Sequence, residues 1–116
     1  MHACTSSYSI GQPVISEHPQ NISALDMNDV IFTCSANGLP RPSISWFQQQ
    51  KDGSLERLSS VGRYSVSVPS LGVDYLTSQL TISSAVLSDA AKYLCKTSTT
   101  VGAIVTSYSY LIVNGN

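Results

Sequence analysis

Apolar and polar residues alternate along most of the chain, and no stretch shows the period of an amphipathic helix. The alternation predicts short strands, because successive side chains of a strand point to opposite faces of a sheet. The clearest runs are residues 30–36, 44–47, 79–83, 91–96 and 110–113. We therefore expect one all-β domain over residues 13–114, a sandwich or barrel, and a flexible leader over residues 1–12.

Turn-forming residues separate these runs, because Gly, Pro, Asn and Asp favour the backbone angles of reverse turns. We expect turns at residues 28–29, 38–40, 52–53, 69–72 and 88–89, and at Gly102.

The charge content excludes several classes of partner. Charged residues make up 11% of the chain and the net charge is −1, so no basic stripe exists for nucleic acid or for an anionic membrane. No run approaches the roughly 20 apolar residues that cross a bilayer, so direct membrane insertion of this fragment is not expected. Partners are expected to be proteins.

The chain has three cysteines, Cys4, Cys34 and Cys95. An odd number leaves one cysteine unpaired or paired outside the domain. Cys4 is the natural spare, because it lies in the polar leader, where it could also bridge two copies of the chain.

The motifs around the other two cysteines resemble the immunoglobulin superfamily. Cys34, Trp46 and Cys95 stand in the order of that family, and residues 89–95 (Asp-Ala-Ala-Lys-Tyr-Leu-Cys) resemble its D-x-A-x-Y-x-C motif. Residues 34–46 are similar to the C-x-A-x-G-x-P-x-P-x-I-x-W run of the I-set, a subclass found in adhesion molecules, receptor ectodomains and muscle proteins. The cysteines stand farther apart than in most I-set domains, which suggests an extra excursion after Trp46.

The resemblance implies an immunoglobulin-like β-sandwich of two antiparallel sheets joined by a Cys34–Cys95 disulfide. It further implies three framework roles for four residues: the ring of Trp46 packs on the disulfide, Tyr93 forms a tyrosine corner, and Arg63 pairs with Asp89. The alternative for the cysteines is a reduced, buried pair, as in intracellular muscle-type domains.

Sites for chemistry are scarce. Asn21-Ile22-Ser23 is an N-glycosylation acceptor motif, which by itself is a weak signal. The acidic stretch over residues 26–29 offers too few ligands for calcium and is interpreted as a turn. With two histidines, no phosphate loop and no nucleophile motif, we expect no catalytic residue, no metal and no cofactor.

Strand phase predicts an apolar surface on one sheet. If Trp46, Tyr93 and Cys95 face inward, the intervening side chains face outward, as do the even-numbered residues near the C-terminus. The candidate binding face consists of Phe47, Leu94, Tyr108, Tyr110 and Ile112, with Val101, Gly102 and Ile104 as a candidate loop beside it. A contiguous apolar face on a domain of this size indicates an interface, unless a bulge shifts the phase or the apolar residues are scattered. The opposite sheet shows polar Thr77, Gln79, Thr81 and Ser83 outward.

These features favour an extracellular recognition or adhesion module of a cell-surface receptor or adhesion molecule. Its protein partner is either another copy of the chain or an unlike protein. The partner is expected to bind the sheet face formed by the strands that are called G, F and C in immunoglobulin domains. The alternative is a structural spacer domain of an intracellular cytoskeletal or muscle protein. A variable-type antigen receptor is less favoured because no G-x-G bulge precedes the last strand, and an enzyme is the least favoured class.

Overall fold

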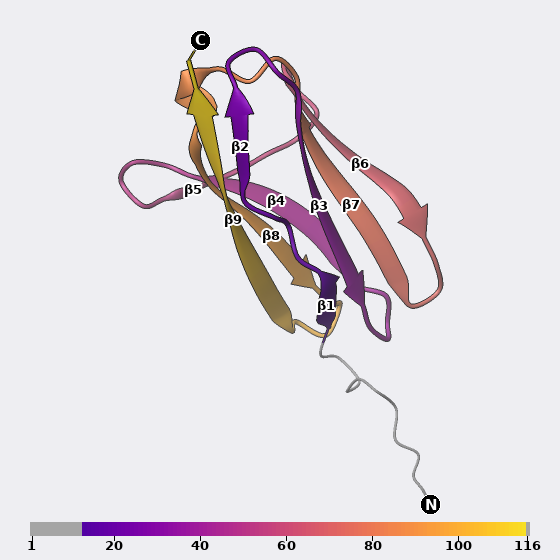
Figure 1. Ribbon diagram of the computed structural model, residues 1–116. Coiled ribbons are helices and arrows are strands. Elements are labelled where there is room, and N and C mark those ends of the chain that lie inside the picture. The colour runs from indigo at the N-terminus through magenta and orange to yellow at the C-terminus, as the bar shows by residue number, and fades with distance from the viewer. Residues whose placement is uncertain (1–12, 116) are drawn as a thin grey trace, which may run out of the picture.

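The computed structural model describes residues 13–115, which form two β-sheets packed face to face (Figure 1). One sheet has four strands in the order β1-β3-β7-β6, and the other has five in the order β2-β9-β8-β4-β5. Neighbouring strands are antiparallel except β2 and β9, which run parallel. The predicted β-sandwich is confirmed. The elements are β1 (Val14–Glu17), β2 (Ile22–Leu25), β3 (Val30–Asn37), β4 (Ser43–Gln49), β5 (Leu55–Arg57), β6 (Tyr64–Leu71), β7 (Tyr75–Ile82), the short 3₁₀ helix η1 (Leu87–Asp89), β8 (Ala91–Ser98) and β9 (Ile104–Asn114).

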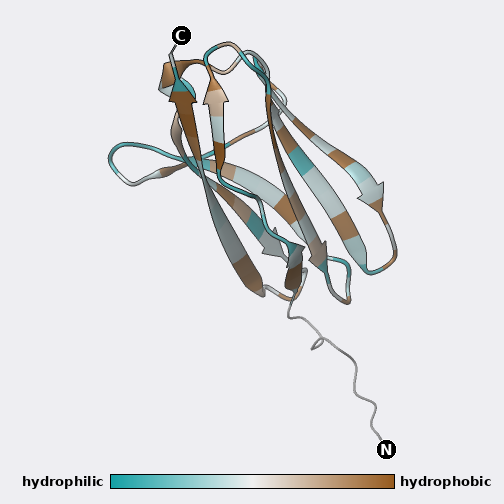
Figure 2. Cartoon of the chain, in the orientation of Figure 1, coloured by the Kyte–Doolittle hydropathy of each residue, from teal (hydrophilic) through white to brown (hydrophobic). Residues whose placement is uncertain are grey.

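Inward-facing positions of both sheets form the apolar core. Along β3, Val30, Phe32, Cys34 and Ala36 are buried, and the residues between them face outward. Figure 2 shows the same alternation along β7 as brown bands separated by paler ones. Burying such a side chain stabilises the fold by about 1.5–3 kcal/mol relative to exposing it, which fixes the register of each strand.

The turn expected at residues 69–72 is wrong over most of its length, because β6 continues to Leu71. β6 is an edge strand, and its pairing with β7 slips between Ser67 and Ser70, which leaves Pro69 outside the ladder. Proline is tolerated at such a bulge because its missing N–H is not needed there. The chain reverses after Gly72, where any side chain would overlap the Tyr75 ring.

The first two strands divide between the sheets. β1 pairs with β3, and after Pro19 the chain crosses so that β2 pairs with β9. Figure 1 shows β2 and β9 side by side, with both arrows pointing the same way. The crossing places Asn21 at the edge of the five-stranded sheet, next to Tyr110.

The extra length between the cysteines contains β5, which pairs with β4 at the other edge of the same sheet. Within residues 13–115, no helix is long and apolar enough to cross a membrane.

Candidate recognition face

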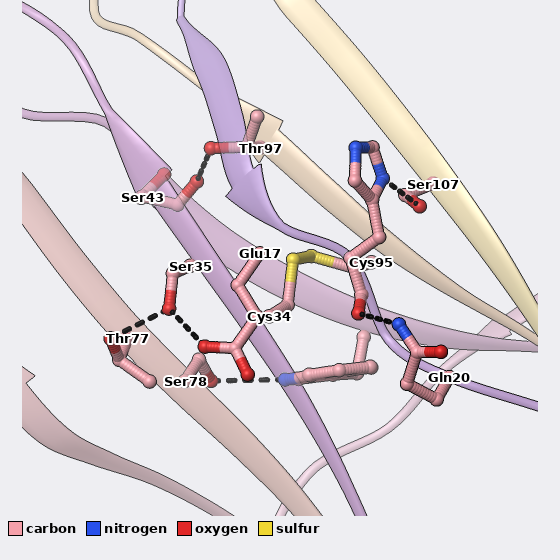
Figure 3. The surroundings of a disulfide bond; sticks show 12 residues. Glu17, Gln20, Cys34, Ser35, Ser43, Thr77, Ser78, Cys95, Thr97 and Ser107 are labelled. Carbon is pink, nitrogen blue, oxygen red and sulfur yellow. Dashed lines mark hydrogen bonds between the residues drawn. A yellow bond between two sulfur atoms is a disulfide. The ribbon is translucent and has the colours of Figure 1, made fainter.

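A disulfide and a buried tryptophan hold the two sheets together at their centre. Cys34 on β3 is bonded to Cys95 on β8, with the two Cα atoms 6.5 Å apart (Figure 3). Trp46 on β4 is fully buried and lies opposite Cys95 in the ladder. Its indole N–H donates to Ser78 Oγ at 2.9 Å, and Ser78 donates to the carbonyl of Ser67 at 3.1 Å. The one polar atom of the indole is therefore paired inside the core.

A second link joins the sheets near η1. Asp89 accepts hydrogen bonds from both terminal nitrogens of Arg63 at 2.7 and 3.0 Å, from the Tyr64 hydroxyl at 2.8 Å and from the Val86 N–H at 2.9 Å. Burial alone would raise the pKa of Asp89, but these hydrogen bonds outweigh burial and hold the pKa below its ordinary value. The charged carboxylate therefore anchors the start of β6 to the turn before β8.

Tyr93 completes this link. Its hydroxyl donates to the Asp89 carbonyl at 2.6 Å and accepts from Gln48 Nε2 at 2.9 Å, while its ring lies 5.3 Å from that of Phe32. Burial raises the pKa of Tyr93, so the hydroxyl remains a hydrogen-bond donor. The hydroxyl is engaged by the framework and is not presented to a substrate.

The outer side of the five-stranded sheet carries large apolar and aromatic side chains together with two lysines. We call this set the aromatic face: Phe47 on β4, Lys92, Leu94 and Lys96 on β8, and Tyr108, Tyr110 and Ile112 on β9. The three β9 side chains are 53%, 50% and 57% exposed. β9 pairs with β8 without a bulge, so they keep the outward phase expected from the alternation.

Leu94 belongs to the candidate binding face, but only 7% of it is accessible. Leu94 has the outward phase, but it occupies the central strand of the face, where it pairs with Phe47 on one side and Tyr108 on the other. Side chains directly opposite each other on neighbouring strands are close enough to cover one another. Leu94 is therefore the floor beneath the exposed rings, and a partner would contact the rings.

The lysines lie against these rings. Lys92 Nζ is 4.0 Å from the centroid of Tyr108, and Lys96 Nζ is 5.6 Å from that of Phe47. At these distances cation–π interactions hold the ammonium groups on the aromatic rings. Arg57, opposite Phe47 on β5, adds a third cation.

Carboxylates are excluded from the outward positions of this sheet. Along its five strands, all of which lie in the described part of the chain, the single acidic residue is Glu56. Glu56 pairs with Gln48, whose side chain reaches inward to Tyr93, so Glu56 has the opposite phase. The aromatic face is therefore purely cationic in its ionised groups.

The candidate loop forms the turn between β8 and β9. Gly102 has a φ of +92°, and its N–H donates to the Thr99 carbonyl at 3.0 Å. This left-handed backbone suits glycine. Val101 and Ile104 are exposed beside it, and Ile104 shares the outward phase of Tyr108.

Asn21 is exposed at the β2 edge of the same sheet. Its Oδ1 accepts a hydrogen bond from the Tyr110 N–H at 2.9 Å. Cys4 and the leader over residues 1–12 lie outside the described residues.

The cations of the face were missed by the sequence analysis. Lys92 and Lys96 flank Leu94 at a spacing of two residues, so the alternation already contained their outward phase. Arg57 belongs to a strand of three residues, too short to show any alternation.

A profile described as an immunoglobulin domain matches residues 12–98 of the chain. The chain therefore belongs to the immunoglobulin-domain family. Immunoglobulin domains are non-enzymatic modules.

The relatives are much longer proteins, and this chain matches only a small part of each. The chain is 38% identical over 84 residues to human hemicentin-1. This match covers 71% of the chain and 1% of hemicentin-1. It is 29% identical over 100 residues to Drosophila melanogaster neuroglian, covering 86% of the chain and 7% of that protein. It is 28% identical over 100 residues to a Caenorhabditis elegans titin homolog, covering 81% of the chain and 0%, after rounding, of the homolog.

Among solved structures, the N-terminal Ig1-2 module of the Drosophila receptor protein tyrosine phosphatase DLAR superposes with a TM-score of 0.76 at 28% identity. The match covers 90% of this chain and 50% of that one. The relatives include adhesion and receptor proteins, which supports an adhesion-type immunoglobulin module.

Proposed function

We propose that this domain is an extracellular recognition or adhesion module, of the I-set type, that binds a protein partner through the aromatic face. The observation that carries the proposal is the contrast within one sheet: large aromatic side chains stay half exposed although their neighbours are buried. Tyrosine and cationic side chains of this kind are favoured anchors in protein interfaces.

The Cys34–Cys95 bridge supports the extracellular setting, because disulfides persist in oxidising compartments and are rare in the cytosol. The adhesion and receptor proteins among the relatives support the same setting.

The charges of the aromatic face favour an unlike, acidic partner. Two copies meeting face to face would bring Lys92, Lys96 and Arg57 of one copy against the same cations of the other. Like charges at an interface cost free energy, whereas a partner that offers carboxylates would pair with them. Recognition of an unlike protein is therefore favoured over self-pairing through this face.

The test is a binding screen of the multimerised domain against a panel of secreted and cell-surface ectodomains, with the domain itself included. We expect a bound ectodomain that is lost with Phe47→Glu/Tyr108→Glu and retained with Ile31→Glu. Ile31 is a matched control, because it is an exposed apolar residue on the other sheet. Binding that survives the double substitution would contradict the face, and an absence of any partner would contradict the function.

Sedimentation equilibrium decides the self-pairing question. Cys4→Ser protein, which cannot form a bridge through the leader, should remain a monomer at micromolar concentration. A dimer abolished by Phe47→Glu/Tyr108→Glu would instead establish like-to-like adhesion.

The second candidate is a structural spacer of an intracellular muscle-type protein, which the titin homolog favours. It predicts reduced Cys34 and Cys95 in the native setting and no partner for the aromatic face. Thiol labelling of protein isolated from its source, followed by mass spectrometry, separates the two functions.

A further inference from the structure

The side chain of Asn21 is fixed by its hydrogen bond to β9. Its Oδ1 accepts from the Tyr110 N–H at 2.9 Å, and a backbone N–H can be accepted only by the oxygen of a carboxamide. The nitrogen Nδ2 is thereby turned away from the strand, and no hydrogen bond to it occurs within residues 13–115. Nδ2 is the atom to which an N-linked oligosaccharide is attached.

The acceptor motif lies on the same side of the sheet as the aromatic face. On β2, Ile22 and Ala24 pack against the core, whereas Ser23, and Asn21 just before the strand, are exposed. Ile22 pairs with Leu111 in the parallel ladder, so Asn21 lies beside Tyr110 and projects from the same surface.

We infer that Asn21 carries an N-linked oligosaccharide whose first sugars lie across the ring of Tyr110. The glycan then occupies the β2–β9 end of the aromatic face and leaves the β8–β4 end for protein. This inference rests on the extracellular setting of the proposed function and not on the existence of a protein partner.

The chemistry requires a lipid-pyrophosphate-linked oligosaccharide as the donor. Asn21 Nδ2 loses a proton to solvent and forms a bond to C1 of the N-acetylglucosamine that is attached to the pyrophosphate of the donor. The bond between that carbon and the pyrophosphate oxygen breaks, and the lipid pyrophosphate leaves with the bonding electrons. Ser23 supplies the hydroxyl of the acceptor motif.

The geometry limits how far the glycan reaches. Neighbouring strands lie about 4.8 Å apart, so β9 is one strand spacing from Asn21 while Phe47 on β4 is three spacings, about 14 Å, away. The first sugar can therefore contact Tyr110, whose half-exposed ring offers a flat apolar surface to the C–H groups of a pyranose. Phe47 and Lys96 lie beyond that first sugar.

The test compares wild-type protein with Ser23→Ala, both secreted from cultured animal cells. Ser23→Ala destroys the motif but keeps Asn21 and its hydrogen bond to Tyr110. Intact mass before and after glycosidase treatment should show a glycan at Asn21 in the wild type alone. Nitration of the folded proteins, mapped by peptide mass spectrometry, should modify Tyr110 severalfold more slowly in the wild type, whereas Tyr75 on β7 should react equally in both.

A second variant guards against a conformational effect of Ser23→Ala. Asn21→Asp keeps an oxygen that accepts from Tyr110 and removes the glycosylated nitrogen, so its Tyr110 should react as in Ser23→Ala. Unmodified Asn21 in secreted, disulfide-bridged wild type would overturn the glycan site. Equal nitration of Tyr110 with and without glycan would overturn its placement. The proposed function is tested separately in the binding screen. It fails if Ser23→Ala protein, which carries no glycan, binds no ectodomain.

Discussion

The two outer faces of the sandwich differ in how their side chains are satisfied. On the four-stranded sheet, Ser35 Oγ lies 2.8 Å from Thr77 Oγ1 and donates to Glu17 at 3.2 Å, while Gln79 Nε2 donates to Thr33 at 3.3 Å. We call the outer side of this sheet, with Glu17, Thr33, Ser35, Thr77 and Gln79, the hydroxyl face. Its outward polar groups bond to one another across the strands.

The aromatic face on the five-stranded sheet is satisfied only in part. Its lysines lie against rings, but Tyr108, Tyr110 and Ile112 remain about half exposed. A face whose groups bond to one another gains little from a partner, whereas exposed apolar area is stabilised when a partner covers it. The comparison therefore supports the proposal that a partner binds the five-stranded sheet and not the four-stranded one.

The largest expected effect comes from removing the disulfide that links the two sheets. Cys34→Ala/Cys95→Ala removes a covalent link across a long loop, which by the chain-entropy relation lowers the free energy of unfolding by about 4 kcal/mol. Urea denaturation followed by tryptophan fluorescence measures the loss. A double variant as stable as the wild type would show that packing alone joins the faces.

The second link should account for acid sensitivity. Asp89→Asn removes the charge that Arg63 and Tyr64 bind, and we expect a loss of about 2 kcal/mol at neutral pH, since the Arg63 side chain is partly exposed to solvent. The pKa of Asp89 is lower in the folded than in the unfolded chain, so the stabilisation is present above an ordinary value of 3.8 and is lost as pH falls below it. Urea midpoints between pH 7 and pH 2 should therefore fall more steeply for the wild type than for Asp89→Asn, and parallel curves would contradict the assignment.

Converting one face into the other is the direct test of the comparison. Phe47→Thr/Tyr108→Thr gives the aromatic face the character of the hydroxyl face. We expect the free energy of unfolding to fall by about 1–2 kcal/mol, because Leu94 loses the two rings that cover it, and binding to an identified partner to weaken by about 2 kcal/mol or more. Calorimetry of unfolding and of binding measures the two effects.

The matched control is Ser35→Ala/Thr77→Ala on the hydroxyl face. It should lower stability by about 1 kcal/mol, because it removes a cross-strand hydrogen bond, and leave binding unchanged. If both double variants weakened binding equally, the proposal that only the aromatic face binds a partner would be wrong.

The smallest effect is expected at Ser109 on the inner side of the five-stranded sheet, and Ser78 on the inner side of the four-stranded sheet serves as its control. Within residues 13–115, Ser109 Oγ on β9 is the one buried side-chain polar atom without a hydrogen-bond partner. Ser109→Ala should therefore raise stability by up to about 1 kcal/mol. Ser78→Ala, the same change on β7, should lower it by about 1–3 kcal/mol, because the Trp46 indole would lose its acceptor. Thermal unfolding distinguishes the signs, and a shared sign would contradict this account.

The sequence predicted the strands whose faces differ most in burial. β3, β7 and β9 alternate cleanly because one side of each packs in the core, and the alternation of β9 also carried the outward phase of Tyr108 and Tyr110. β5 could not be predicted in the same way, since all three of its residues are exposed. No strand was predicted at β6, and a turn was predicted at its end because proline is a turn signal in the sequence; only the edge position of Pro69 makes it compatible with a strand.

Leu94 marks a different limit of sequence reasoning. Alternation gives the direction of a side chain but not what neighbouring strands place over it. Its burial depends on Phe47 and Tyr108, which lie far from it in the sequence and meet it only through the register of three strands. The lysines on the rings likewise follow from packing across strands.

Pro69 has a consequence beyond the local shape of β6. An exposed sheet edge offers unpaired N–H and C=O groups, onto which a strand of another molecule can add. In this domain β1, β2 and β5 are edges of at most four residues, and the longer edge β6 is interrupted at its bulge by a proline. Closely spaced copies, at the local concentrations found on a cell surface or in a multidomain chain, are thereby protected from fusing into shared sheets.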